Sequence, residues 1–236
     1  MKHIIVDYRI SEEEELSLVK LGYKILKCPP SNHLYEAVCG HPDMLMHIID
    51  NENVIVHQDM NLDFINILKS LNYNVLLSSN KLIDKYPYDI ILNAVNFKNC
   101  FMHNIKYTDK TLLKKINYKK IINVKQGYTK CSTAIIKDTG IITSDNAIAS
   151  IMKEENIDVL LLPPGDIILP GLNYGFIGGC CGMIDENIIA FYGNLKYYAY
   201  GKEVMNFLYK HDVKPIFLHD GKLIDRGSIF VIDNYK

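Results

Sequence analysis

The chain has 236 residues, of which 48% are hydrophobic and 22% are charged, and its formal net charge is −1. This composition is typical of a globular protein, and the near-neutral charge argues against nucleic acid or an anionic membrane as a partner. No apolar run approaches the roughly 18 residues that a membrane helix requires. The six cysteines form no CxxC pair and the N-terminal segment lacks signal-peptide features, so we expect a cytoplasmic protein with reduced thiols.

The first elements along the chain have clear local signals. Residues 3–7 form an apolar run that predicts a strand. Ser11 and Glu14 have the spacing of a capping box, which begins a helix that Gly22 ends. A further strand is expected within residues 22–30, before two prolines.

The next elements repeat a fixed order of strand, strand, helix and strand. In the second unit these elements are expected at 44–50, 54–59, 61–71 and 74–83. A degenerate copy runs from about Asn99 to Val124 and has no clear second strand. The fourth unit is expected at 131–137, 141–145, 147–155 and 158–168, and the fifth at 179–185, 188–194, 202–210 and 214–224. Polar residues at the ends of second strands, among them Asp7 and Asp145, are expected to cap helices.

The two chain ends complete this pattern. Residues 227–233 resemble a first strand and residues 3–7 a second strand, so one unit is assembled from both termini. The other four units start near residues 41, 99, 126 and 176. A repeat of this length predicts a closed architecture without exposed sheet edges. We therefore predict a single α/β domain over residues 1–236, a five-bladed α/β propeller of ββαβ repeats.

The repeat order and several motifs carry a resemblance to a known fold. The motifs are GHPDMLMH (40–47), VKQGYTKCS (124–132), ITSD (142–145), LPGLNYGFIGG (169–179) and LIDRGSI (223–229). The chain resembles the pentein, or guanidine-modifying-enzyme, superfamily, and is most similar to an uncharacterised bacterial family of that fold. The resemblance implies a pentein propeller, and it implies chemistry on guanidine-like compounds for those members that are enzymes.

The chain departs from the catalytic members at one position. Those enzymes use a cysteine that attacks the guanidinium carbon, a histidine that handles protons, and carboxylates that hold the guanidinium nitrogens. Their cysteine begins the strand closest to the C-terminus. Here that place reads Asp225-Arg226-Gly227-Ser228, which contains no cysteine.

In a ring of this kind the starts of the first strands converge on a central axis. The repeats place Met44, Cys100, Cys131, Gly179 and Gly227 at equivalent positions, with charged residues beside them. The candidate ligand-binding residues near the axis are Asn99, Gln126, Lys130, Gly178, Gly179, Cys180, Arg226 and Ser228. A layer that contains Asp43, Lys130 and Arg226 is more than plain core, because unpaired buried charge is costly.

Cys131 is the preferred nucleophile. Lys130 beside it, or Arg226 through space, is expected to lower its pKa and so make the thiol reactive. The alternative is a structural thiol, since free cysteine is often buried. Whether Cys131 or Cys180 faces the axis depends on the alignment of the repeats, because a shift of one residue reverses the direction of each side chain.

His41 and Asp43 are the candidate acid–base pair, because Pro42 fixes the chain between them. The alternative is a turn in which both side chains bond to the backbone. Gly178 and Gly179 permit close backbone approach, either to a ligand or to the crowded centre. No spacing predicts a metal site, and no phosphate or dinucleotide loop is present, so no cofactor is expected.

Two functions remain open from sequence. The first is a cysteine-dependent hydrolase or transferase that acts on a small guanidine- or amidine-like compound. The second is a non-catalytic pentein that binds a small metabolite or a partner protein. Both place a small ligand or partner at the central axis, and neither specifies an oligomeric state.

Overall fold

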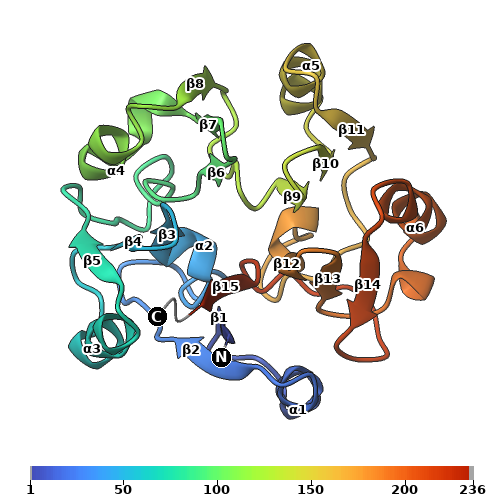
Figure 1. The fold of residues 1–236 in the computed structure, drawn as a ribbon, viewed down its shortest axis with the longest axis horizontal. Coiled ribbons are helices and arrows are strands. Elements are labelled where there is room, and N and C mark those ends of the chain that lie inside the picture. The colour runs from blue at the N-terminus through green and yellow to red at the C-terminus, as the bar shows by residue number, and fades with distance from the viewer. Residues whose placement is uncertain (1, 234–236) are drawn as a thin grey trace.

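The computed structural model describes residues 2–233, which form five three-stranded sheets. Figure 1 shows the sheets around a common centre with the longer helices on the outside. The sheets are β15-β1-β2 (Phe230–Asp233, Lys2–Asp7, Lys24–Cys28), β3-β4-β5 (Met46–Ile48, Asn53–Val56, Asn74–Leu77), β6-β7-β8 (Val95–Asn96, Cys100–His103, Lys120–Asn123), β9-β10-β11 (Thr133–Ile136, Gly140–Thr143, Asp158–Leu161) and β12-β13-β14 (Cys181–Asp185, Ile188–Phe191, Lys214–Phe217).

Each sheet has the same internal connectivity. The central strand pairs antiparallel with the first strand and parallel with the third, and a helix makes the crossover that a parallel pair requires. These crossover helices are α1 (Glu12–Lys20), α3 (Leu62–Ser70), α4 (Lys110–Lys115), α5 (Asn146–Glu154) and α6 (Gly201–Lys210). Shorter helices are α2 (Pro42–Leu45), η1 (Ile105–Tyr107), η2 (Ile177–Gly179) and η3 (Leu195–Tyr197). Five sheets of this order fit the five predicted repeats.

The first sheet is assembled from the two ends of the chain, as predicted. β1 pairs antiparallel with β15, with Ile4 opposite Val231 and Ile5 opposite Phe230. Within residues 2–233 each of the named sheets is separate from the next, so the expected closed propeller is not shown. The capping box at Ser11 is present, with Ser11 Oγ accepting from Glu14 N and Glu14 accepting from Ser11 N.

The predicted start of the third unit at Asn99 is wrong. Its first strand is the two-residue β6, and Cys100 begins the second strand, β7. The strand predicted as the first of this unit is therefore its second strand, β7, and the true first strand is β6. A strand of two residues has no alternation that a sequence pattern can detect.

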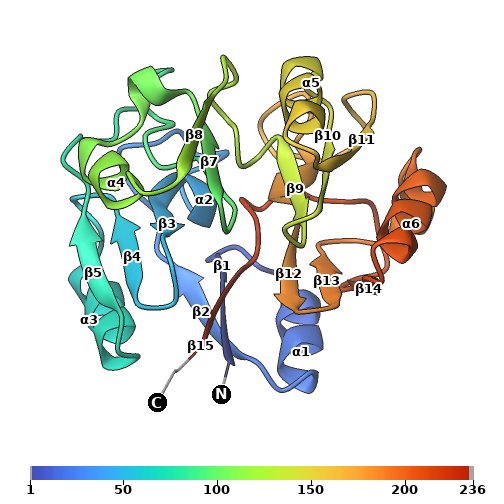
Figure 2. The same ribbon diagram turned by 45° about the horizontal axis from the view of Figure 1, so that its top comes forward.

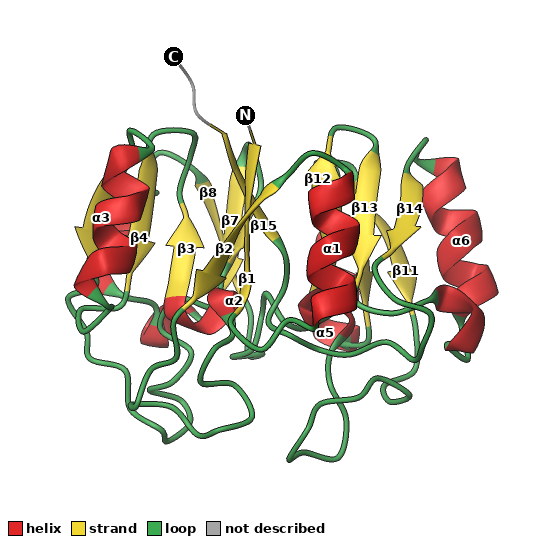
Figure 3. Ribbon diagram, turned by 90° about the horizontal axis from the view of Figure 1, so that it is seen from below, coloured by secondary structure: helices red, strands yellow, loops and turns green. Residues whose placement is uncertain are grey.

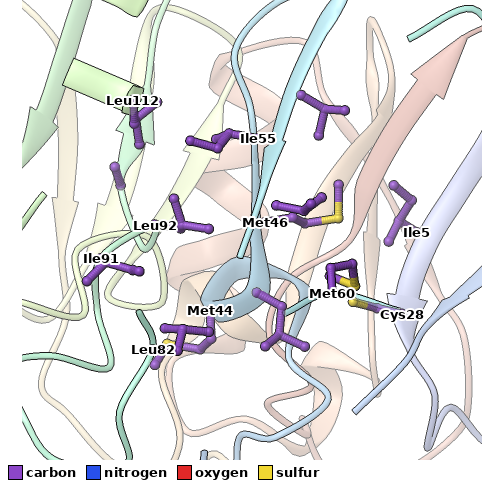
Figure 4. Packing of buried hydrophobic residues seen from close by; sticks show 14 of the residues in the cluster. Ile5, Cys28, Met44, Met46, Ile55, Met60, Leu82, Ile91, Leu92 and Leu112 are labelled. Atoms are coloured by element: carbon purple, nitrogen blue, oxygen red, sulfur yellow. The ribbon is translucent and has the colours of Figure 1, made fainter. Parts of the chain in front are cut away.

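Loops gather at one end of the molecule and the termini lie at the other. Figures 2 and 3 show this polarity, with α2 at the loop end and β3 running away from it. The buried core reaches the loop end, where Met44 of α2 packs near Leu82 (Figure 4). The starts of the first strands therefore lie between a packed core and the loops.

No helix in the described part of the chain is both long and apolar enough to cross a membrane.

Pairing of the termini gives a stability prediction. Ile4 lies in the middle of β1 with no exposed surface, whereas Val19 of α1 is 50% exposed. We expect Ile4→Ala to lower the free energy of unfolding by about 2–5 kcal/mol, because it leaves a cavity in the sheet that joins the two chain ends. Val19→Ala is the control and should cost less than about 1 kcal/mol. Equal urea midpoints for the two variants would contradict the account.

Candidate functional site

The candidate site forms where the five first strands begin. The residues two positions ahead of these strands are Met44, Asn93, Cys131, Gly179 and Ser228. The structure thus brings together the predicted Cys131, Asp43, Lys130, Gly178, Gly179 and Ser228. Two of the predicted equivalent positions are therefore wrong: the third unit has Asn93 in place of Cys100, and the unit shared by the termini has Ser228 in place of Gly227.

Cys131 is buried, with 4% of its surface exposed. Its Sγ lies 3.3 Å from Asp43 Oδ2, to which the thiol donates, and 3.0 Å from Asn93 Nδ2. Burial, followed by the charges of Asp43 and Asp225, raises the pKa of the Cys131 thiol well above its ordinary value. The expected lowering of this pKa by Lys130 or Arg226 is therefore wrong, because burial and then the nearby carboxylates favour the neutral thiol.

A chain of polar contacts joins Lys130 to Cys131. Lys130 Nζ donates to Ser228 Oγ at 2.9 Å and to the carbonyl oxygen of Gly178 at 3.2 Å. Ser228 Oγ lies 2.7 Å from Asp43 Oδ2, which also accepts from Cys131. All four side chains are buried. Asp43 Oδ1 has no hydrogen-bond partner among the described residues.

Asn93 was missed by the sequence analysis and organises this centre. Its Nδ2 donates to the carbonyl oxygen of Asp43 at 3.0 Å and contacts Cys131 Sγ. Its Oδ1 accepts from the backbone N–H groups of Lys130 at 2.9 Å and Cys131 at 3.2 Å. One amide therefore joins the backbone that leads into Cys131 to the backbone of Asp43. A correct start of the third unit would have revealed it.

His41 lies between two buried carboxylates. Its Nε2 is 3.9 Å from Asp7 Oδ2, and its Nδ1 is 3.8 Å from Asp225 Oδ1. Arg9 pairs with Asp7 Oδ2 at 2.6 Å, so Asp7 is an ion-pair partner and not the helix cap expected from sequence. His41 precedes Pro42 at the start of α2. The side chain of Asp43 instead accepts hydrogen bonds from Cys131 and Ser228, so the two predicted acid–base residues have different neighbours.

Asp225 is a second carboxylate that sequence reasoning did not select. Oδ2 accepts from Phe176 N at 2.8 Å and Oδ1 from Gly227 N at 3.0 Å. Burial raises the pKa of Asp225, and the charge of Asp43 raises it further, against the lowering effect of His41. A Cβ on Gly179 would lie 1.9 Å from Asp225 Oδ1, so this glycine makes room for the carboxylate.

The other predicted site residues lie elsewhere. Asn99 is exposed, and Cys100 belongs to a separate core cluster. Gln126 Nε2 bonds to Asp145, which caps α5. Cys180 is fully buried and its thiol donates to the carbonyl oxygen of Ile177.

Arg226 is directed away from Cys131. Its Nε lies 3.0 Å from Glu14 Oε2, and its Nη1 donates to the carbonyl oxygen of Arg9. It belongs with Arg9 to a cavity of about 320 Å³ that shares His41 and Asp225 with the site.

A pocket of about 330 Å³ opens on Cys131, His41 and Asp225. Its walls are mainly aromatic and aliphatic, and they include Tyr35, Tyr128, Phe176, Leu169 and Leu172. We call it the aromatic pocket. The residues that line it include a carboxylate but no lysine or arginine. Among the described residues, no cluster of three His, Cys, Asp or Glu side chains is placed to hold a metal ion.

Comparison with known proteins identifies both a sequence family and a fold. The family described as "Family of unknown function (DUF6873)" matches residues 5–230. No curated protein matches the chain in sequence.

Solved structures of the pentein superfamily match the fold, which confirms the resemblance seen in the sequence. An amidinotransferase, SxtG from Microseira wollei, has a TM-score of 0.55 and 11% identity, and the match covers 91% of this chain and 87% of that one. DDAH from Pseudomonas aeruginosa, in complex with citrulline, has a TM-score of 0.54 and 9% identity over 91% of each chain. The agmatine deiminase of C. jejuni with substrate bound has a TM-score of 0.54 and 13% identity over 98% and 92% of the two chains.

The Asn93 contacts predict a large effect on stability. Asn93→Ala removes the amide that bonds to Cys131 N and to the carbonyl oxygen of Asp43 and leaves both backbone groups without that partner, at about 1–3 kcal/mol for each. Lys130 N keeps its bond to the backbone carbonyl oxygen of Asn93. We expect the free energy of unfolding to fall by about 3 kcal/mol in urea titrations. Asn187→Ala, at an exposed turn, is the matched control and should change it little. A similar small effect for both variants would contradict the role given to Asn93.

The raised pKa of Cys131 predicts how its alkylation depends on pH. The iodoacetamide rate at Cys131, measured by mass spectrometry, should still be rising above pH 9, because the neutral thiol is favoured. Asp43→Asn removes the negative charge and weakens the acceptor of the thiol, so the apparent pKa should fall and the rate at pH 8 should increase. Cys180 in the same protein, whose pKa burial also raises, is the internal control. An unchanged or higher apparent pKa at Cys131 would be inconsistent with this electrostatic account.

Proposed function

We propose that this chain, which belongs to the family of unknown function DUF6873, binds a small amidinium or guanidinium cation in the aromatic pocket and transforms it at Cys131. The observation that carries the proposal is the charge of the site. Asp225 lines the pocket and Asp43 lies directly behind the thiol, with no lysine or arginine in the pocket wall. Buried carboxylates without a cationic partner are costly, so a cationic ligand is favoured there.

The shape and chemistry of the wall support the same ligand class. Tyr128 and Phe176 lie with ring centroids 6.2 Å apart in the pocket wall. Aromatic faces attract cations, and a desolvated contact of this kind is worth about 2 kcal/mol. A flat amidinium group is matched to the two oxygens of a carboxylate.

A bound cation also supplies the positive charge that the resting thiol lacks beside it. Burial and the charges of Asp43 and Asp225 keep Cys131 protonated, but a positive charge beside the sulfur lowers its pKa. We propose that the thiol proton passes to His41 and that Sγ then attacks the amidinium carbon. The C–N bond to the leaving amine breaks as that amine takes the proton from His41.

The second half of the reaction releases the product. Water attacks the carbon that is bonded to sulfur, the C–S bond breaks, and the thiol recovers its proton. The net reaction converts amidinium and water to an amide or urea and an ammonium ion. If an amine replaces water, the same sequence is an amidine transfer, as the names of the similar amidinotransferases suggest.

Binding without turnover is the second candidate, and one observation favours it. The resting Cys131 thiol has a raised pKa, and the strand closest to the C-terminus carries no cysteine. In this case Cys131 only lines the pocket, and the protein binds a small cationic metabolite without transforming it.

Closure of the five sheets into a pseudo-fivefold propeller is also our proposal, supported by the β15–β1 pairing. A cytoplasmic location is likewise proposed, on the basis of six cysteines that are all free.

The ligand class is tested with a matched pair, benzamidine and its neutral analogue benzamide. Isothermal titration should show that benzamidine binds at least tenfold more tightly. Asp225→Asn should remove most of that preference, because a hydrogen bond to a charged partner is worth about 1.5–3 kcal/mol. Glu186→Gln, at an exposed position, is the control. Equal binding of the cation and the amide would exclude the proposed ligand class.

Turnover is tested separately with a panel of guanidines and amidines, by release of ammonia. Cys131→Ala should bind benzamidine but release none, whereas Cys100→Ala should behave as the parent protein. If the parent binds the cation and yet releases no ammonia from any compound, the binding-only function is correct.

A further inference from the structure

A third cavity, of about 720 Å³, lies among the first strands of all five sheets. Every one of these strands contributes to its wall, through His47 of β3, Asn96 of β6, Ile135 of β9, Met183 of β12 and Phe230 of β15. We call it the central cavity. The aromatic pocket is lined by residues that precede the first strands, whereas the central cavity is bounded by the turns that follow them. The two cavities therefore lie at opposite ends of these strands.

Lys130 reaches into the central cavity from the site. Its side chain is 9% exposed, and its Nζ donates to Gly178 O and Ser228 Oγ and lies 5.9 Å from the centre of the Phe230 ring. An ammonium group has three donors, and these contacts use two. Both acceptors are neutral, so the buried positive charge has no carboxylate directly against it within the described residues.

Glu52 and Lys98, at the mouth of the cavity, are exposed to solvent, and the other charged groups there have hydrogen-bond partners. Asp50 Oδ1 accepts from the backbone N–H groups of Glu52 and Asn53, and Asp138 Oδ1 accepts from Lys98 N. Lys119 Nζ donates to Asn96 Oδ1 and to the carbonyl oxygen of Phe97. Of the charged residues that line this cavity, Lys130 is the buried one, so its ammonium group is the least screened by solvent. The wall around it is largely apolar, with Met183, Phe230 and Ile135.

We propose that the central cavity is a second ligand site, which binds a small organic carboxylate with an apolar body. The carboxylate pairs with Lys130, and the body packs against Met183 and Phe230. A charge-assisted hydrogen bond in a low-dielectric cavity gives such a ligand its selectivity over a neutral analogue. This cavity is separate from the aromatic pocket, and its ligand has the opposite charge.

Two methionines report separately on the two cavities. Met183 lines the central cavity and Met44 lines the aromatic pocket. The protein, labelled with ¹³C at the methionine methyl groups, is titrated with benzoate and with benzamide, and the signals are assigned with Met183→Leu and Met44→Leu. Benzoate should shift the Met183 signal and leave Met44 in place. Benzamide should bind at least tenfold more weakly.

Lys130→Met should abolish the benzoate shift at Met183, whereas Lys98→Met at the mouth should retain it. Because Lys130 is buried and that variant can fail to fold, the comparison of benzoate with benzamide on the parent protein decides the question without it. Equal shifts by benzoate and benzamide, no shift at Met183, or a benzoate shift confined to Met44 would each overturn the proposal.

Discussion

The site depends on one electrostatic constraint, which is the burial of carboxylates where five strands begin. Asp7, Asp43 and Asp225 are each at most 3% exposed, although isolated buried charge is strongly unfavourable. The structure compensates them unequally. Arg9 pairs directly with Asp7, while Asp225 receives two backbone N–H groups and Asp43 receives a hydroxyl and a thiol. This inequality leaves negative charge beside Cys131 and supports the cationic ligand that we propose for the aromatic pocket.

The same constraint explains the surrounding backbone. Gly179 accommodates Asp225, and Gly178 lies against the carbonyl oxygens of Lys130 and Thr133. Asn93 joins the backbone of Lys130 and Cys131 to that of Asp43. Lys130 supplies positive charge through Ser228, but from the side of the central cavity. The polar centre thus separates a cavity suited to a cation from one suited to an anion.

Much of the fold was predictable, because each repeat has a local pattern. The sequence correctly predicted the capping box at Ser11, the order of strands and helices, and the pairing of the two chain ends. The third unit was not, since a first strand of two residues has no periodicity, and that error displaced Asn93 in favour of Cys100. Asp225 was missed because its partners His41 and Phe176 are distant in sequence. Asp7 was misassigned although its partner Arg9 is only two residues away, because its position at a strand end also fits a helix cap. Even the sign of the Cys131 pKa shift required the three-dimensional arrangement, since Lys130 is adjacent in sequence and yet directed elsewhere.

The most direct test of the account compares two alkylating agents that differ in charge, 2-chloroacetamidine and 2-chloroacetamide. Intact-protein and peptide mass spectrometry would give the rate of each at every cysteine. If the aromatic pocket delivers cations to the thiol, the amidine should modify Cys131 much faster than the amide does and much faster than it modifies Cys39 or Cys100, and benzamidine should protect Cys131. Equal rates for the two reagents at Cys131, or modification by the amidine only after unfolding, would contradict the claim that this thiol faces a cation-selective pocket.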